Sequence, residues 1–256
     1  MKHCTLYVTC LSALALLAGA PAQAQNAEQE KPPVFIYLSE WTVSRAQWPE
    51  MVKLDEQDKS MMDKMIADGS LVSYGAFTNL IHQEGQPTHG TWMTATSEGS
   101  ILKALETVYA HPGSTNARVE GDSKHWDYLL VSRIYNQRPG KSNDGYLAGD
   151  QWYVKPGQMQ AYTRLVKSQL VPVMEKLIAD GAVNAYGMAT EDFHTGKMGL
   201  VTFYFTTPDA TSFDKASKAM DAIFDASPSL NAAFRSMVDS EGHIDFLDRL
   251  RYMNSK

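Results

Sequence analysis

The chain lacks several features that would assign it to a functional class. Its only cysteines, Cys4 and Cys10, lie within the first 24 residues, so the remainder cannot form disulfides, thiolate metal sites or a cysteine nucleophile. Lys and Arg number 23 against 29 Asp and Glu, and no overall positive charge favours nucleic acid as a partner. The 256 residues contain no G-x-S-x-G motif, phosphate-binding glycine-rich loop, dinucleotide fingerprint or calcium loop. No single motif therefore names a reaction, and whether the protein is an enzyme stays open.

Residues 1–24 are typical of a secretory signal peptide. A polar start is followed by an apolar run over residues 11–20, and Ala22-Gln23-Ala24 supplies the small-x-small cleavage pattern. The run is shorter than the roughly 20 apolar residues that cross a bilayer. We expect cleavage near Ala24, no stable membrane insertion and a periplasmic or secreted location, with an uncleaved anchor as the alternative. Residues 25–33 are polar, end in two prolines, and are expected to form a flexible lead-in.

The rest of the chain repeats itself. Residues 64–75 recur as residues 176–187 with seven of twelve positions identical, and residues 125–129 resemble residues 243–247. Two matches in the same order indicate a duplicated unit rather than chance similarity. We expect one unit over residues 34–136, a linker rich in Gly, Asn and Ser over residues 137–149, and a second unit over residues 150–256.

Each half shows the same sequence of hydrophobic patterns. Apolar residues with a period of two predict strands, and apolar residues with 3–4 spacing predict helices. Asp68-Gly69 and Asp180-Gly181 are expected to end the first helix of each half, because Gly adopts a left-handed conformation at little cost. Strands are expected at 35–43, 71–81, 90–96 and 128–135, then at 151–154, 183–193, 199–206 and 244–252. The resulting order, β-α-β-β-α-β twice, predicts an α+β fold of two tandem ferredoxin-like repeats.

Each such unit covers only one face of its sheet with helices, so the bare faces of the two units are expected to meet as a pseudo-dimeric α/β barrel. This order, the repeated Ala-Asp-Gly…Tyr-Gly segment and the stretch Trp152 to Gly157 resemble the dimeric α/β-barrel superfamily, in particular its antibiotic-monooxygenase-like members, in a fused form. The resemblance implies a fold but no single chemistry, since the superfamily includes cofactor-free monooxygenases, lactone isomerases, haem enzymes and proteins without a known reaction.

Charged residues share one face of the last strand of each half. By the period of two, Asp127 and Arg133 lie on one such face and Asp245 and Arg251 on the equivalent one. They are candidates for lining a polar cavity that binds an anionic or carbonyl-bearing ligand. The alternative is that each pair forms a structural ion pair that holds the two halves together.

Aromatic residues of the predicted strands form a second candidate set. Tyr74 and Tyr186 occupy equivalent positions, and together with Trp92 and Tyr204 they are candidates for the wall of a cavity for an apolar ligand. The alternative is that these side chains simply fill the core, as aromatic residues in strands usually do.

His82 and His194 occupy matching places near the two predicted hairpin turns. A pair of imidazoles could bind a metal or a haem iron. Neither histidine lies in a metal-ligand motif, however, and turn histidines are commonly solvated. We therefore expect no cofactor, with haem as the alternative.

These patterns favour an exported protein that binds a small, partly apolar molecule in a cavity between its two halves. Two alternatives are a cofactor-independent monooxygenase or isomerase that uses the same cavity, and a structural protein whose interior is filled by side chains. A small-molecule ligand is the expected partner, and a homodimer is also open.

Overall fold

The computed structural model describes residues 31–81, 84–111 and 123–256. The signal peptide expected over residues 1–24 lies outside these ranges, as does most of the expected lead-in. The first half comprises β1 (Val34–Thr42), the 3-10 turn η1 (Arg45–Gln47), α1 (Trp48–Asp68), β2 (Ser73–Asn79), β3 (His89–Ala95), α2 (Glu98–Ala110) and β4 (Lys124–Gln137). After the short β5 (Gly140–Ser142), the second half comprises β6 (Tyr146–Val154), α4 (Met159–Leu165), the π-helical turn η2 (Val166–Leu170), α5 (Val171–Ala179), β7 (Ala185–Glu191), β8 (Leu200–Thr207), α6 (Ala210–Asp225), α7 (Pro228–Met237) and β9 (Val238–Ser255).

The strands form a closed antiparallel barrel. Their order is β2-β3-β1-β4-β7-β8-β6-β9, and pairing of β2 with β9 completes the ring. Two seams join the halves: β4 pairs with β7, and β9 pairs with β2. The fold is therefore α+β, with both walls of one barrel supplied by a single chain, and β5 extends the sheet beside the end of β9.

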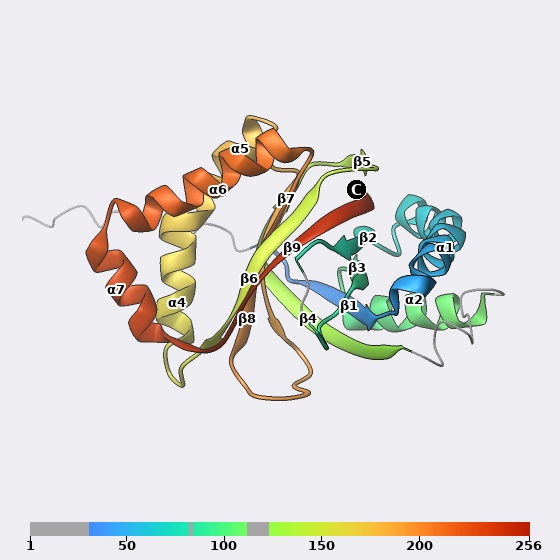
Figure 1. Ribbon diagram of the computed structural model, residues 1–256, viewed down its shortest axis with the longest axis horizontal. Helices are drawn as coiled ribbons and strands as arrows, with labels where there is room; N and C mark the ends of the chain where they lie inside the picture. Colours follow the sequence, from blue (N-terminus) through green and yellow to red (C-terminus); the bar gives the residue numbers. More distant parts are fainter. Residues whose placement is uncertain (1–30, 82–83, 112–122) are drawn as a thin grey trace, which may run out of the picture. The chain divides into compact units, whose positions relative to one another are not determined.

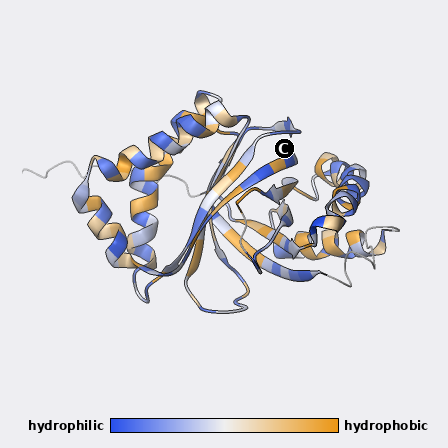
Figure 2. Cartoon of the chain, in the orientation of Figure 1, coloured by the Kyte–Doolittle hydropathy of each residue, from blue (hydrophilic) through white to orange (hydrophobic). Residues whose placement is uncertain are grey.

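Helices cover the outside of the barrel, with α1 and α2 on one side and α4 to α7 on the other (Figure 1). Hydrophilic and hydrophobic residues alternate along them, as amphipathic helices require (Figure 2). Each helical layer packs on its own core: Met62, Leu71 and Ile101 belong to the first, and Met174 and Val183 to the second.

Local sequence explains where the helices end. Gly69 caps α1 with a φ of 84°, and Gly181 follows α5 with a φ of 77°. Both glycines adopt the left-handed conformation predicted for them. The side chains of Ser97 and Asp209 accept hydrogen bonds from the backbone at the starts of α2 and α6, which satisfies an otherwise unpaired N–H in each first turn.

The same three-residue contact occurs at both seams. At one, Tyr74 donates to a carboxylate oxygen of Asp63 at 2.6 Å, and Asn254 donates to the same atom at 2.6 Å. At the other, Tyr186 donates to Glu175 at 2.6 Å, and Asn136 donates to both Glu175 oxygens at 2.7 and 3.0 Å. Tyr74 is opposite Asn254 in the strand register, and Tyr186 is opposite Asn136. The two tyrosines thus lie in equivalent surroundings and tie a helix of one half to the last strand of the other.

The structure departs from the expected elements in two places. The predicted linker over residues 137–149 is largely strand, because it contains β5 and the start of β6. Its Gly and Asn residues bend the chain between strands without interrupting the sheet; Gly140 and Gly145 take φ values of 134° and 123°. The second half also gains α7, which the hydrophobic pattern did not single out; it packs Phe234 against Trp152 and Tyr162.

Candidate functional site

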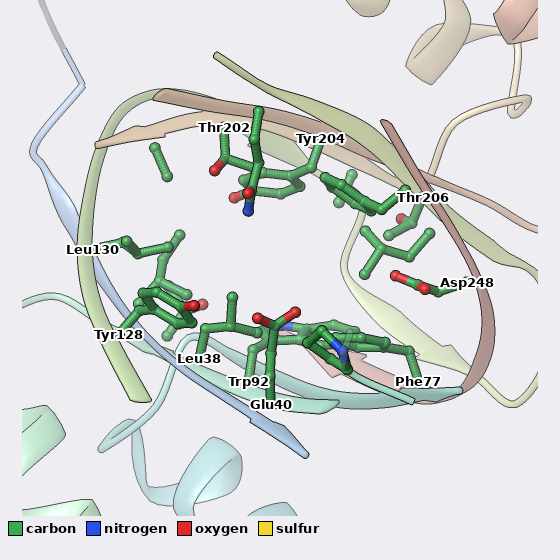
Figure 3. A pocket seen from close by; sticks show the side chains of 18 of the residues that line it. Leu38, Glu40, Phe77, Trp92, Tyr128, Leu130, Thr202, Tyr204, Thr206 and Asp248 are labelled. Atoms are coloured by element: carbon green, nitrogen blue, oxygen red, sulfur yellow. The ribbon is translucent and has the colours of Figure 1, made fainter. Parts of the chain in front are cut away.

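The barrel is hollow. A cavity of about 680 Å³ lies inside it and is lined by residues from all eight strands (Figure 3). Protein pockets for small molecules typically measure roughly 300–1,000 Å³, so the space suits one organic molecule of moderate size. The structure therefore contradicts the alternative of a barrel interior filled by side chains.

Alternation along the strands decides which side chains point inward. Leu38 and Glu40 of β1 line the cavity, as do Tyr128 and Leu130 of β4, and Thr202, Tyr204 and Thr206 of β8. In each strand these residues are two positions apart, so their side chains project from the same face. Figure 3 shows them converging from opposite walls of the barrel.

Aromatic rings make up much of the wall, and two of them lie over glycines. A Cβ atom at Gly75 would collide with the indole of Trp92, and one at Gly187 would collide with the phenol of Tyr204. Gly75 and Gly187 are equivalent in the sequence repeat, as are Trp92 and Tyr204. Each half thus uses a glycine to let a large ring lie flat against the wall. The other aromatic lining residues are Phe77, Trp126, Tyr128, Tyr135, Tyr186 and Phe246.

Two carboxyl groups face this apolar space. Asp248 of β9 is only 2% exposed, and within the described part of the chain its Oδ1 atom has no hydrogen-bond partner. Burial and the nearby Glu40 charge raise the pKa of Asp248 well above its ordinary value. Burial also raises the pKa of Glu40 to about 7. Figure 3 shows Glu40 rising into the cavity and Asp248 pointing in from the side. Glu40 can therefore exchange a proton near neutral pH, and Asp248 holds its proton more tightly than an ordinary carboxyl group does.

Among the described lining residues there is no Lys or Arg, and His243 is the one basic side chain. An apolar cavity with acidic groups and no fixed cation favours neutral hydrogen-bond donors and cations over anions. The expectation of an anion-binding pocket is therefore not supported by the residues that line it.

The structure brings four of the predicted site residues to the cavity. Trp92, Tyr186, Tyr204 and Asp245 are among its lining residues. The hydroxyl group of Tyr186 is nevertheless bonded to Glu175 of α5, and the Asp245 side chain is 79% exposed at the rim. Tyr74 is outside the lining: its hydroxyl bonds Asp63 of α1.

The other predicted charged residues also lie outside the cavity lining. Asp127 accepts a hydrogen bond from Tyr37 at 2.5 Å and lies 2.9 Å from His125. Arg133 is exposed, and Arg251 lies 3.7 Å from Glu56. The structure thus contradicts both expected ion pairs, Asp127–Arg133 and Asp245–Arg251. Asp127 and Arg251 contact the other residues just named, and Asp245 lies 3.1 Å from His243.

Bulges in the sheet explain the positions of the two arginines. The register of β4 against β7 skips Arg133, and that of β9 against β2 skips Arg251. A bulge inserts an unpaired residue and reverses the alternation beyond it. Before the bulges the even-numbered residues of β4 and β9 face inward, among them Tyr128 and Asp248. The odd-numbered face of β4 and β9, which was predicted to line the cavity, is therefore the outer face. The same period of two, applied to the even-numbered residues, would have found Tyr128 and Asp248.

A matching histidine contact occurs in both halves. The ring of His125 stacks on Trp41 with centroids 3.7 Å apart, and that of His243 stacks on Trp152 at 3.5 Å. His243 and Asp245 border the cavity, together with Ile81 and Ile244. The exposed fractions of Ile81 and Ile244 are 67% and 43%, so this end of the cavity has an apolar, accessible rim.

The two histidines considered for a metal or haem are not brought together by described contacts. His194 is exposed beyond β7, and His82 lies outside the described residues. Within the described ranges, no three His, Cys, Asp or Glu side chains are grouped as a metal ion would require. No helix of these ranges is long and apolar enough to span a membrane.

No protein-family model and no curated protein matches the chain. Solved structures do match. A "putative monooxygenase" from Lactobacillus acidophilus NCFM has a TM-score of 0.64 at 13% identity, over 88% of this chain and 97% of the other. A "putative monooxygenase" from Fusobacterium nucleatum subsp. nucleatum has a TM-score of 0.60 at 10% identity, over 88% and 94%. An "anthrone oxidase-like protein" has a TM-score of 0.54 at 11% identity, over 88% and 94%.

At these identities the similarity concerns the fold alone. It extends over most of both chains in each comparison, and it agrees with the strand order and the closure of the barrel by β2 and β9. The chain therefore has the dimeric α/β-barrel fold, with both halves of the barrel in one polypeptide.

Proposed function

We propose that this protein binds one small, partly apolar, aromatic molecule inside its barrel. The observation that carries the proposal is the cavity of about 680 Å³ with aromatic walls and an apolar rim. Burial of a flat apolar ligand against Trp92, Phe77 and Tyr204 would supply the affinity, at roughly 25 cal/mol for each Å² removed from water. The few polar groups, chiefly Glu40, Asp248 and the threonines of β8, would fix its orientation.

The proposal includes the origin of the barrel as two tandem ferredoxin-like repeats. Its support is the element order of each half, the strand order β4-β1-β3-β2 matched by β9-β6-β8-β7, and the equivalent Tyr-Asn-carboxylate contacts at both seams. We also propose export with cleavage near Ala24, which the mass of the protein isolated from its host would test. A homodimer stays a prediction that sedimentation would test.

Titration with N-phenyl-1-naphthylamine, a neutral aromatic dye that fluoresces in apolar surroundings, tests the binding proposal. Ala189 lines the cavity and is equivalent to Phe77 of the other half. The variant Ala189→Phe places a ring in the cavity, and we expect it to weaken dye binding at least tenfold. Ala232→Phe adds the same ring at an exposed position of α7 and should leave binding unchanged. Equal dye binding by both variants and the wild type would contradict the proposal.

A second candidate is a cofactor-independent monooxygenase that uses the same cavity. It is favoured by one observation, the carboxyl group of Glu40 with a pKa of about 7, since a general base works best when its pKa is near the working pH. As a carboxylate, Glu40 would accept a proton from an acidic O–H or C–H bond of the substrate. Conversion of anthrone and O₂ to anthraquinone and water, faster than in a protein-free blank and lost in Glu40→Gln, would support this activity.

A further inference from the structure

The carboxyl groups of Glu40 and Asp248 both point into the barrel cavity (Figure 3). They come from different halves of the chain, Glu40 from β1 and Asp248 from β9. Asp248 is buried at 2% exposure with Oδ1 unpartnered in the described structure, and it lines the cavity. A buried carboxylate without a partner is costly. The barrel therefore holds an unsatisfied acidic group directed at the space that a ligand would occupy.

Comparison of the two halves shows that neither acidic residue has an acidic counterpart at the equivalent position. The position equivalent to Glu40 is Gln151, and the position equivalent to Asp248 is Leu130; both of these also line the cavity. The two halves have thus diverged at these positions, while Trp92 and Tyr204 keep large rings at equivalent places. A core that served packing alone would have no use for two buried acids, because apolar residues of similar size are usually as stable or more stable.

The neighbouring rings suit a positive charge. Phe77 and Trp92 lie with ring centroids 6.3 Å apart in the same part of the wall as Glu40 (Figure 3). The faces of aromatic rings attract cations, and the attraction grows when water is excluded. No Lys or Arg is among the described lining residues, so no such side chain of this part of the wall competes for the two carboxyl groups.

We propose that the cavity selects an aromatic amine in its protonated form, with the ammonium group held by Glu40 and Asp248 and the aromatic part against Phe77, Trp92 and Tyr204. This inference rests on the proposed function and adds the charge of the ligand. A cation between the two carboxyl groups supplies the hydrogen-bond donors that Asp248 lacks. An anion of the same shape meets two acidic groups and, among the described lining residues, no Lys or Arg.

Three naphthalene compounds of similar size test the charge preference by calorimetric titration at pH 8. They are 1-naphthylmethylamine, which is a cation at this pH, 1-naphthylmethanol, which is neutral, and 1-naphthoate, which is an anion. We expect the amine to bind at least tenfold more tightly than the alcohol, and the naphthoate to bind more weakly than both.

Matched variants locate the preference. Asp248→Asn and Glu40→Gln should each weaken amine binding at least fivefold and change alcohol binding less than twofold. Asp225→Asn on α6 and Glu106→Gln on α2 remove the same charges from exposed positions and should change neither. Thermal denaturation of each variant establishes that it is folded.

The outcomes separate the two proposals. If the alcohol binds and the amine binds no more tightly, or if the two cavity variants keep the preference for the amine, the charge inference is wrong and the binding proposal stands. If neither the alcohol nor the amine binds to the folded wild-type protein, the binding proposal itself fails.

Discussion

Single residues inside the barrel are held in surroundings that disfavour their charge. Burial raises the pKa of Asp248 on β9 and of Tyr128 on β4, and the charge of the nearby Glu40 raises both further through the low-dielectric interior. A carboxyl group in such surroundings binds its proton more tightly than it does in the unfolded chain. The folded protein therefore takes up protons relative to the unfolded chain in the range between the two pKa values.

Glu40→Gln should show this proton uptake as a change in stability. The carboxyl pKa is 4.5 ordinarily and about 7 in the folded protein, so its contribution to the free energy of unfolding is intact below pH 4.5 and falls as the pH rises to 7. We expect the variant to be more stable than the wild type by about 3 kcal/mol at pH 8 and by close to nothing at pH 4. Urea denaturation of both proteins at each pH measures the difference. A difference that does not change with pH would contradict the raised pKa.

The tyrosines of the two seams make a second prediction at the scale of residues. Tyr74→Phe and Tyr186→Phe each remove one hydrogen bond to a carboxylate, and such bonds contribute about 1.5–3 kcal/mol. Because the surroundings are equivalent, the two losses in the free energy of unfolding should agree within about 1 kcal/mol. Chemical denaturation provides the measurement, and a loss in only one variant would show that the seams are not equivalent.

The charged candidates show what the sequence could and could not predict at this scale. Of the predicted candidates, Trp92, Tyr186, Tyr204 and Asp245 are among the lining residues, and their part in ligand binding stays a prediction. Arg133 and Arg251 lie at bulges, and a bulge depends on the register of the partner strand, which a single strand's pattern does not contain. Glu40 and Asp248 were missed because which of the two strand faces points inward depends on how the whole barrel closes.

At the scale of elements, two glycines end the first helix of each half. Gly69 and Gly181 both have a positive φ, a conformation that β-branched residues avoid. Gly69→Val and Gly181→Val should each lower stability by about 1 kcal/mol or more. Differential scanning calorimetry measures the change, and a melting temperature unchanged from the wild type would contradict the role of the left-handed cap.

Most elements were predictable because their signals are local. The helix caps, the apolar periods and the order of strands and helices could all be read from neighbouring residues. The lengths of β4 and β9 were not, since both extend well beyond the apolar segments over residues 128–135 and 244–252. Their outer parts, such as Lys124 and Asp239, are polar and are held in strand conformation by pairing with β1 and β6.

At the scale of the whole molecule, the proposed duplication has two consequences. It would let one chain close a barrel through two equivalent seams, β4 with β7 and β9 with β2, and it would free equivalent positions to diverge. The repeat was visible in the sequence, and so the barrel could be predicted. A cavity between the halves was also expected, but its volume was not, because the volume depends on how far apart the facing side chains are held after both sheets have closed.

The stoichiometry of binding tests the central claim most directly, since that claim is one barrel and one cavity in each chain. Native mass spectrometry of the protein with N-phenyl-1-naphthylamine measures it. We predict that each chain gains the mass of one dye molecule, that a monomer suffices, and that Ala189→Phe abolishes the gain. Binding that requires two chains, or equal binding by the Ala189→Phe variant, would contradict the claim.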